Sequence, residues 1–138
     1  AGIAAIAAEA AAIMARLVTD TRDYCLQRRQ FDQPIASFQV IQHRLVDMHI
    51  AARQAAAAAA MAAEALDLAP SERARAISAA NVTIADAGRF VGQQAVQLHG
   101  GMGMTDELAV SALFKRLTVI ESEFGTRADH LARYMAQG

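Results

Sequence analysis

The fold of this chain is decided by the stretch Gln97-Leu98-His99-Gly100-Gly101-Met102-Gly103-Met104-Thr105. An apolar helical pattern precedes this stretch, a cluster of glycines fills its centre, and a residue able to cap a helix ends it. Glycine enters left-handed backbone conformations freely and lets other groups approach the main chain closely. The stretch therefore predicts two helices joined by a glycine loop, which serves either as a helix stop or as a cradle for a ligand.

Helical patterns extend outward from this loop over almost all of the chain. Apolar residues recur at helical spacing over residues 3 to 30, after Ser37, after Ser71 and after Thr105, and each of these three hydroxyl residues can cap a helix. Gly125-Thr126 separates a last short helix. The sequence thus predicts an all-α fold, an antiparallel four-helix bundle with a short extra C-terminal helix, formed by residues 1–138 as one domain. The residues expected to face the core are Ile6, Ala10, Ile13, Leu17, Tyr24, Phe38, Ile41, Leu45, Met48, Ala52, Ala59, Leu66, Ile77, Ile84, Val91, Ala95, Leu98, Leu113, Leu117 and Ile120.

Composition and charge exclude several classes of function. A formal net charge of -1 argues against nucleic acid or an anionic membrane as a partner. The alanine run over residues 55 to 63 is too short and too weakly apolar to span a membrane, and the first residues, which include Glu9 and Arg16, do not form a signal peptide. A single cysteine, Cys25, excludes an internal disulfide and favours a cytoplasmic protein.

Most motifs that carry chemistry are missing. No Gly-Lys-Ser/Thr follows the glycine loop, and the third glycine of a dinucleotide fingerprint is replaced by Asp106. The four histidines lack the spacing of metal ligands, so we expect no metal site. Cys25 has no nearby histidine and is expected to be a neutral thiol rather than a nucleophile. Considered by themselves, these features predict only a helical bundle.

The order of three local motifs resembles the acyl-CoA dehydrogenase family. The first motif consists of Tyr24, Arg28-Arg29-Gln30-Phe31, Pro34-Ile35, Phe38-Gln39, Gln42 and Asp47-Met48. The glycine stretch is similar to that family's Gln-x-x-Gly-Gly-x-Gly-Tyr/Met-Thr, and Phe124-Gly125-Thr126 falls where the family has Glu-Gly-Thr. The resemblance covers only the C-terminal helical domain of the family. We therefore expect the N-terminal helical domain and the middle β-domain of complete members to be absent from this chain.

The resemblance implies that FAD contacts one part of this domain, across a subunit interface. Arg28 would bind the pyrophosphate, since a guanidinium suits phosphate oxygens. The full set of implied cofactor residues is Arg28, Gln39, Gln97, Gly100, Gly101 and Thr126. Simpler roles stay open on the residues alone: a solvated charge for Arg28, an exposed cap residue for Gln39, and a helix stop for Gly100 and Gly101.

The catalytic base of the family has no counterpart at its usual positions. Most members place a glutamate before Gly-Thr, where this chain has Phe124, and some place it near the start of the first helix, where this chain has Gly2. Glu9 and Glu123 are the candidate substitutes, although Glu9 also fits a polar helix surface. Residues 124–130 resemble the ending of small-subunit members of heteromeric dehydrogenases, in which a partner can supply the base. The alternative is a copy that no longer catalyses.

The function implied by the resemblance is FAD-dependent α,β-desaturation of an acyl-CoA thioester. Electrons would pass to an electron-transfer flavoprotein, and the domain would assemble with other subunits into a homo- or heterotetramer. The isolated domain is expected to be inactive. Two alternatives remain: a helical assembly module without chemistry of its own, and a related flavin oxidase that uses oxygen as acceptor.

Overall fold

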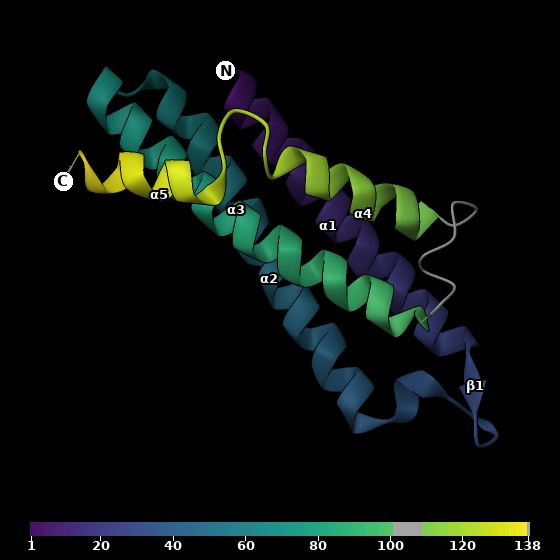
Figure 1. Ribbon diagram of the computed structural model, residues 1–138. Coiled ribbons are helices and arrows are strands. Elements are labelled where there is room, and N and C mark those ends of the chain that lie inside the picture. The colour runs from purple at the N-terminus through teal and green to yellow at the C-terminus, as the bar shows by residue number, and fades with distance from the viewer. Residues whose placement is uncertain (101–108, 138) are drawn as a thin grey trace.

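The computed structural model of the protein describes residues 1–100 and 109–137, and five α-helices make up most of this described part. The helices are α1 (Gly2–Gln27), α2 (Gln39–Glu64), α3 (Pro70–Leu98), α4 (Ala109–Ile120) and α5 (Arg127–Met135). Figure 1 shows α1 and α3 running in one direction, α2 and α4 in the other, and α5 lying across α3. The predicted all-α bundle with a short extra C-terminal helix is confirmed.

The first helix ends earlier than its sequence pattern suggests. It stops at Gln27, and the chain then forms a small antiparallel hairpin of β1 (Arg29–Gln30) and β2 (Gln33–Pro34). The two turn residues, Phe31 and Asp32, have φ values of 51° and 61°. A two-residue turn with both φ angles positive matches the twist of a hairpin. The hairpin therefore places the end of the helix upstream of residue 30, where the predicted helical pattern ended.

Two of the predicted helix caps are wrong. The α2 helix follows Phe38, its N-cap residue, because Ser37 is still the last residue of a short 3₁₀ turn, where its hydroxyl donates to the carbonyl oxygen of Pro34, 2.6 Å away. The α3 helix begins at Pro70, one residue before the expected cap Ser71. Proline suits the first helical position because its missing N–H would have had no partner there. The cap predicted at Thr105 lies outside the described residues.

Small side chains form much of the core, so the helices approach one another closely. Most predicted core positions are buried, and the remainder are partly buried at its margin. The buried members of the predicted set are Ala10, Ile13, Leu17, Met48, Ala52, Ala59, Ile84, Val91, Ala95, Leu98, Leu117 and Ile120. Contacts of α3 with α1, α2, α4 and α5 place this helix at the centre of the bundle.

Within the described residues, α1 is the helix long and apolar enough to cross a membrane by length and composition. Core helices of soluble proteins meet the same criteria. Nine residues of α1 are buried against the other helices, which gives this apolar helix a role as a core element of the bundle.

Candidate functional site

The C-terminal ends of α1 and α3 are joined by stacked side chains. The Tyr24 and His99 rings lie with their centroids 4.4 Å apart at an interplanar angle of 28°. His99 is buried, and its Nδ1 atom donates a hydrogen bond to the carbonyl oxygen of Ala95, 2.8 Å away. This arrangement brings Arg28, just after α1, and Gly100, just after α3, to the same end of the bundle (Figure 1).

Three of the cofactor residues predicted from the resemblance present polar groups to solvent at this end, whereas Thr126 lies at the opposite end, two residues after Phe124. Arg28, Gln39 and Gln97 are exposed, and the Arg28 guanidinium has no hydrogen-bond or ion-pair partner among the described residues. Gly100 has a φ of 60°, and no atom of residues 1–98 or 109–137 lies within 4 Å of the position that a Cβ would take. Its backbone is therefore accessible to a ligand. The remaining predicted residue of the loop, Gly101, lies outside the described residues.

The two positions that lack the family base lie in contact at the opposite end. A Cβ built on Gly2 would lie 3.1 Å from Cζ of the Phe124 ring. Phe124 has a φ of 59° and is 55% exposed, so its ring covers the start of α1 from the turn before α5. No carboxylate stands at either position.

Both candidate bases bind the same arginine. Arg116 donates from Nε to Oε1 of Glu9 at 2.6 Å and from Nη2 to Oε2 of Glu9 at 2.7 Å. Its Nη1 atom donates to Oε1 of Glu123 at 3.0 Å. The hydrogen bonds from Arg116 lower the pKa of Glu9, although partial desolvation opposes this shift. A carboxylate stabilised in its charged form is a weaker proton acceptor, which makes Glu9 a poor general base in this arrangement.

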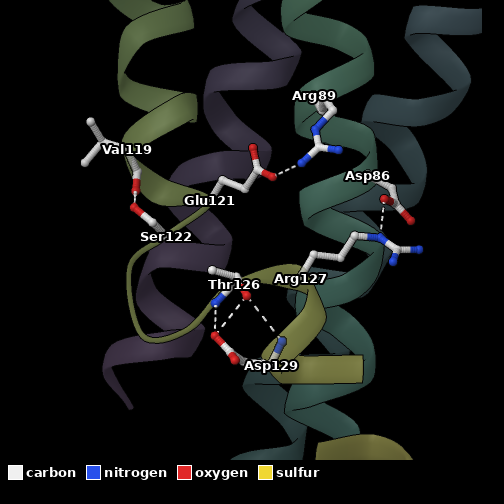
Figure 2. Close-up of polar contacts among 8 residues, drawn as sticks. All are labelled: Asp86, Arg89, Val119, Glu121, Ser122, Thr126, Arg127 and Asp129. Atoms are coloured by element: carbon white, nitrogen blue, oxygen red, sulfur yellow. Dashed lines mark hydrogen bonds and ion pairs between the residues drawn. The ribbon is translucent and has the colours of Figure 1, made fainter. Parts of the chain in front are cut away.

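Thr126 begins α5 through a reciprocal pair of hydrogen bonds with Asp129, shown in Figure 2. The Thr126 N–H and hydroxyl donate to Oδ2 of Asp129 at 2.8 and 2.9 Å, and the Asp129 N–H donates back to the Thr126 hydroxyl at 3.3 Å. The pKa of Asp129 is lowered, chiefly by the hydrogen bond that its carboxylate accepts from the backbone N–H of Thr126. Thr126 thus holds the C-terminal helix, and the predicted break at Gly125-Thr126 is confirmed.

Two ion pairs connect the C-terminal segment to α3 (Figure 2). Arg127 donates to Oδ1 of Asp86 at 2.5 Å, and Arg89 pairs with Glu121. These pairs flank a cavity of about 210 Å³ between α3, α4 and α5, with an apolar floor that includes Ile84. The pairs fix the turn that carries Phe124 relative to the bundle.

Cys25 lies buried beside the core and forms no disulfide. Burial raises the pKa of its thiol, as expected for an unreactive cysteine. Among the described residues, no group of three histidine, cysteine, aspartate or glutamate side chains is placed to hold a metal ion.

Sequence reasoning did not identify Arg116, which binds both candidate bases. Glu9 and Arg116 are 107 positions apart, so no local spacing indicates their contact. It also missed His130, whose buried imidazole lies close to Gly125.

Comparison with known proteins identifies relatives over nearly the whole chain. The family model described as acyl-CoA dehydrogenase, C-terminal domain, matches residues 3–137. Acyl-CoA dehydrogenase IpdE2 of Mycobacterium tuberculosis is 34% identical over 80% of this chain, and 3-(aryl)acrylate reductase of Clostridium sporogenes is 32% identical over 88%. The chain spans about a third of the length of these relatives, 33% and 32% respectively.

A solved structure of the ChsE4-ChsE5 complex from Mycobacterium tuberculosis has the same fold. It superposes with a TM-score of 0.84 at 27% identity, over 98% of this chain and 36% of that one. The match extends through both ends of the bundle described above.

Proposed function

This chain belongs to the acyl-CoA dehydrogenase family, and we propose that it acts as the C-terminal helical domain of an FAD-dependent enzyme that desaturates an acyl-CoA thioester. Enzymes of this family generally use FAD. The flavin supplies a hydride acceptor when bound, and an electron-transfer flavoprotein is the proposed recipient of the electrons. We place the protein in the cytoplasm, where its free cysteine would stay reduced.

The single observation that carries this proposal is the free polar surface beside the Tyr24–His99 stack. Arg28 has a guanidinium without a partner among the described residues, and Gly100 has an open backbone there, and both suit the phosphate groups of a dinucleotide. Gln39 and Gln97 can add amide hydrogen bonds from the same end. Gly101 and Thr126 belong to the proposed set on the resemblance alone, and Thr126 lies at the opposite end of the bundle, beside Phe124. Arg28, Gln97 and Gly100 would therefore hold part of the FAD.

The length of α1 suggests that its two ends serve different parts of an assembly. Glu9 near its start and Arg28 just after its end are separated by about 28 Å at the α-helical rise. One end would contact FAD held mainly by another subunit, while the Phe124 end would face the substrate thioester. This division requires oligomers, and the ChsE4-ChsE5 relative is itself a complex of two proteins.

The missing base favours a second candidate, a subunit that contributes contacts but does not itself remove the proton. Gly2 and Phe124 carry no carboxylate, and Arg116 holds both Glu9 and Glu123. In that case a partner subunit would supply the base for the reaction.

Flavin retention by the full-length assembly tests the proposed cofactor contact. We expect Arg28→Ala to lower the flavin content after dialysis, because its charge-assisted contact with the pyrophosphate is lost. Arg22→Ala is the matched control, since Arg22 is also exposed on α1 but pairs with Asp23. Equal flavin contents in the two variants would remove Arg28 from the site.

Activity of the same assembly tests the reaction. A yellow protein that reduces a dye in the presence of acyl-CoA without forming peroxide supports a dehydrogenase, whereas peroxide formation indicates an oxidase. Separate Glu9→Gln and Glu123→Gln variants then locate the base through anaerobic bleaching of the flavin. If both variants bleach at the rate of the unmodified protein, neither glutamate is the base, and the contributing-subunit candidate is favoured.

A further inference from the structure

His130 is a buried imidazole without a hydrogen-bond partner. The residue is only 2% exposed, and neither Nδ1 nor Nε2 of its ring has a hydrogen-bond partner among the described residues. Buried polar groups in native proteins are nearly always paired, so an unpaired group needs an explanation such as a water molecule or an ion. His130 lies on the wall of a cavity of about 280 Å³ between the first turn of α1, the first turns of α3, and α5. We call it the α3–α5 cavity.

Two guanidinium groups share this cavity with His130. Arg73 has no side-chain partner among the described residues, and Nη1 of Arg133 has only a long 3.5 Å contact with the carbonyl oxygen of Phe124. Nη1 of Arg133, Nε2 of His130 and Cβ of Asp129 each lie 3.5 Å from one point, the position that a Cβ on Gly125 would take. The Arg133 guanidinium and the His130 imidazole therefore lie close together beside Gly125, and both residues line the α3–α5 cavity.

No acidic side chain lines the α3–α5 cavity in the described part of the chain. The nearest acid on α5, Asp129, is occupied by its two hydrogen bonds from Thr126. Pro70, the first residue of α3, also lines the cavity, so the positive end of that helix dipole adds to the charge of the arginines. Glu72 in the first turn of α3 is not among the lining residues.

We propose that the α3–α5 cavity binds a phosphoryl group through Arg73, Arg133 and His130. Guanidinium groups bind phosphate oxygens with two parallel hydrogen bonds, and the start of a long helix favours an anion. One N–H of the neutral imidazole supplies the donor that is now without a partner. The cavity is larger than a phosphate ion, so the group is either free phosphate or the phosphomonoester of a larger molecule such as coenzyme A.

The electrostatics of His130 agree with an anion at this place. Desolvation by burial lowers the pKa of His130, the Arg133 charge lowers it further, and Asp129 opposes this in part. A bound phosphate dianion would place negative charge between these cations. Binding should therefore raise the pKa of His130 and take up a proton, a response that a purely structural histidine would not show.

Titration of the flavin-free 138-residue chain with inorganic phosphate tests the proposal by NMR. We expect shifts of the amide signals at the start of α3 and in α5, together with a rise in the His130 pKa followed on its ring protons. Arg73→Gln and Arg133→Gln should each weaken phosphate binding by about tenfold, the usual loss for one charge-assisted hydrogen bond. Arg22→Gln, an exposed substitution of the same kind on α1, should leave binding unchanged.

The opposite results would overturn the proposal. The proposal fails if the amide signals of α3 and α5 show no saturable shifts on adding phosphate, or if phosphate leaves the pKa of His130 unchanged. It also fails if Arg22→Gln weakens phosphate binding as much as Arg73→Gln and Arg133→Gln do. Circular dichroism of each variant verifies that the helices remain folded. Coenzyme A in a parallel titration identifies the source: tighter binding than phosphate at the same amides indicates the coenzyme, whereas equal or weaker binding indicates free phosphate. Because no flavin is needed, the result does not depend on the proposed redox function.

Discussion

The ring of Phe124 lies against the backbone of Gly2, with Cζ 3.1 Å from the position of a Cβ on that glycine. This contact joins the first residue of α1 to the turn before α5. Relatives place a catalytic glutamate at one or the other of these positions, according to the resemblance described above. A side chain at position 2 would therefore begin in contact with the Phe124 ring, and this proximity predicts that a carboxylate placed at either position could reach the same substrate.

Introducing a carboxylate at residue 124 tests whether only the base is missing. In the full-length assembly we expect Phe124→Glu to accelerate anaerobic flavin bleaching by acyl-CoA by about a hundredfold or more, the usual contribution of a general base. Ser122→Glu is the control, because it adds the same charge to the exposed turn two residues earlier. If the two variants bleach at the same rate, the Phe124 position does not face the reacting carbon.

The Glu9–Arg116 ion pair predicts a loss of stability in acid. Arg116 lowers the pKa of Glu9 below its ordinary value of 4.5, so the unfolded chain takes up this proton first as the pH falls. The stabilisation is therefore complete above 4.5 and is lost as the pH falls through the folded-state pKa. Glu9→Gln should lower the free energy of unfolding slightly at neutral pH, and the difference should vanish in acid. Urea unfolding measures this difference in the free energy of unfolding. Glu64 is exposed and has no ion-pair partner among the described residues, so Glu64→Gln should show no such difference.

His130 predicts a second and separate acid response. Burial lowers its pKa below the ordinary 6.5, so the unfolded state binds the proton first and the stability falls as the pH drops below 6.5. One such group changes the free energy of unfolding by at most about 1.4 kcal/mol per pH unit. The charged residues that line its two cavities are Arg73, Arg89, Glu121, Arg127 and Arg133, and Asp129 precedes it on α5.

The pH dependence of stability is measured by unfolding the unmodified chain and the His130→Leu variant in phosphate-free buffer. His130→Leu should remove the fall in stability just below 6.5, and at neutral pH it should cost little, because it replaces an unpaired polar group with an apolar one. His43→Leu changes an exposed histidine on α2 and should keep the response of the unmodified chain. A response that persists in His130→Leu would assign it to another group.

The sequence predicted the bundle well because helical periodicity reports burial directly. Ile84, Val91 and Leu98 repeat every two turns of α3, and all three are buried. The ends of helices were less predictable, since they depend on local competition. Ser37 could cap α2 by composition, yet it belongs to the preceding 3₁₀ turn, within which its hydroxyl donates to the Pro34 carbonyl oxygen.

The candidate site was predictable only where its residues follow one another along the chain. Thr126 could be placed at the start of a helix from its position between a glycine and an acidic turn. Glu9 pairs with Arg116, and His130 is buried without a hydrogen-bond partner among the described residues. Both features depend on contacts between helices that are far apart in the sequence. A sequence without an alignment contains no signal for such contacts, and this is why both features appeared only in the structure.

Two glycines of α3, one turn apart, differ sharply in the space around them. A Cβ on Gly92 would lie 2.9 Å from Cδ2 of Phe114 on α4, a distance that requires the ring to move. A Cβ on Gly88 would meet only Leu117, at an ordinary 3.8 Å. Alanine is more favourable than glycine inside a helix by about 1 kcal/mol, so Gly88→Ala should leave the free energy of unfolding unchanged or raise it.

Gly92→Ala should instead destabilise the chain by about 1 to 3 kcal/mol, since overpacking outweighs the gain in helix propensity. Urea unfolding of the two variants gives the comparison, with equal slopes expected because neither changes the surface exposed on unfolding. Phe114→Leu in the Gly92→Ala background should recover part of the loss, as it removes the ring that the new methyl group meets. Equal stabilities for Gly88→Ala and Gly92→Ala would show that α4 shifts freely on α3, and that the ring does not fix their approach.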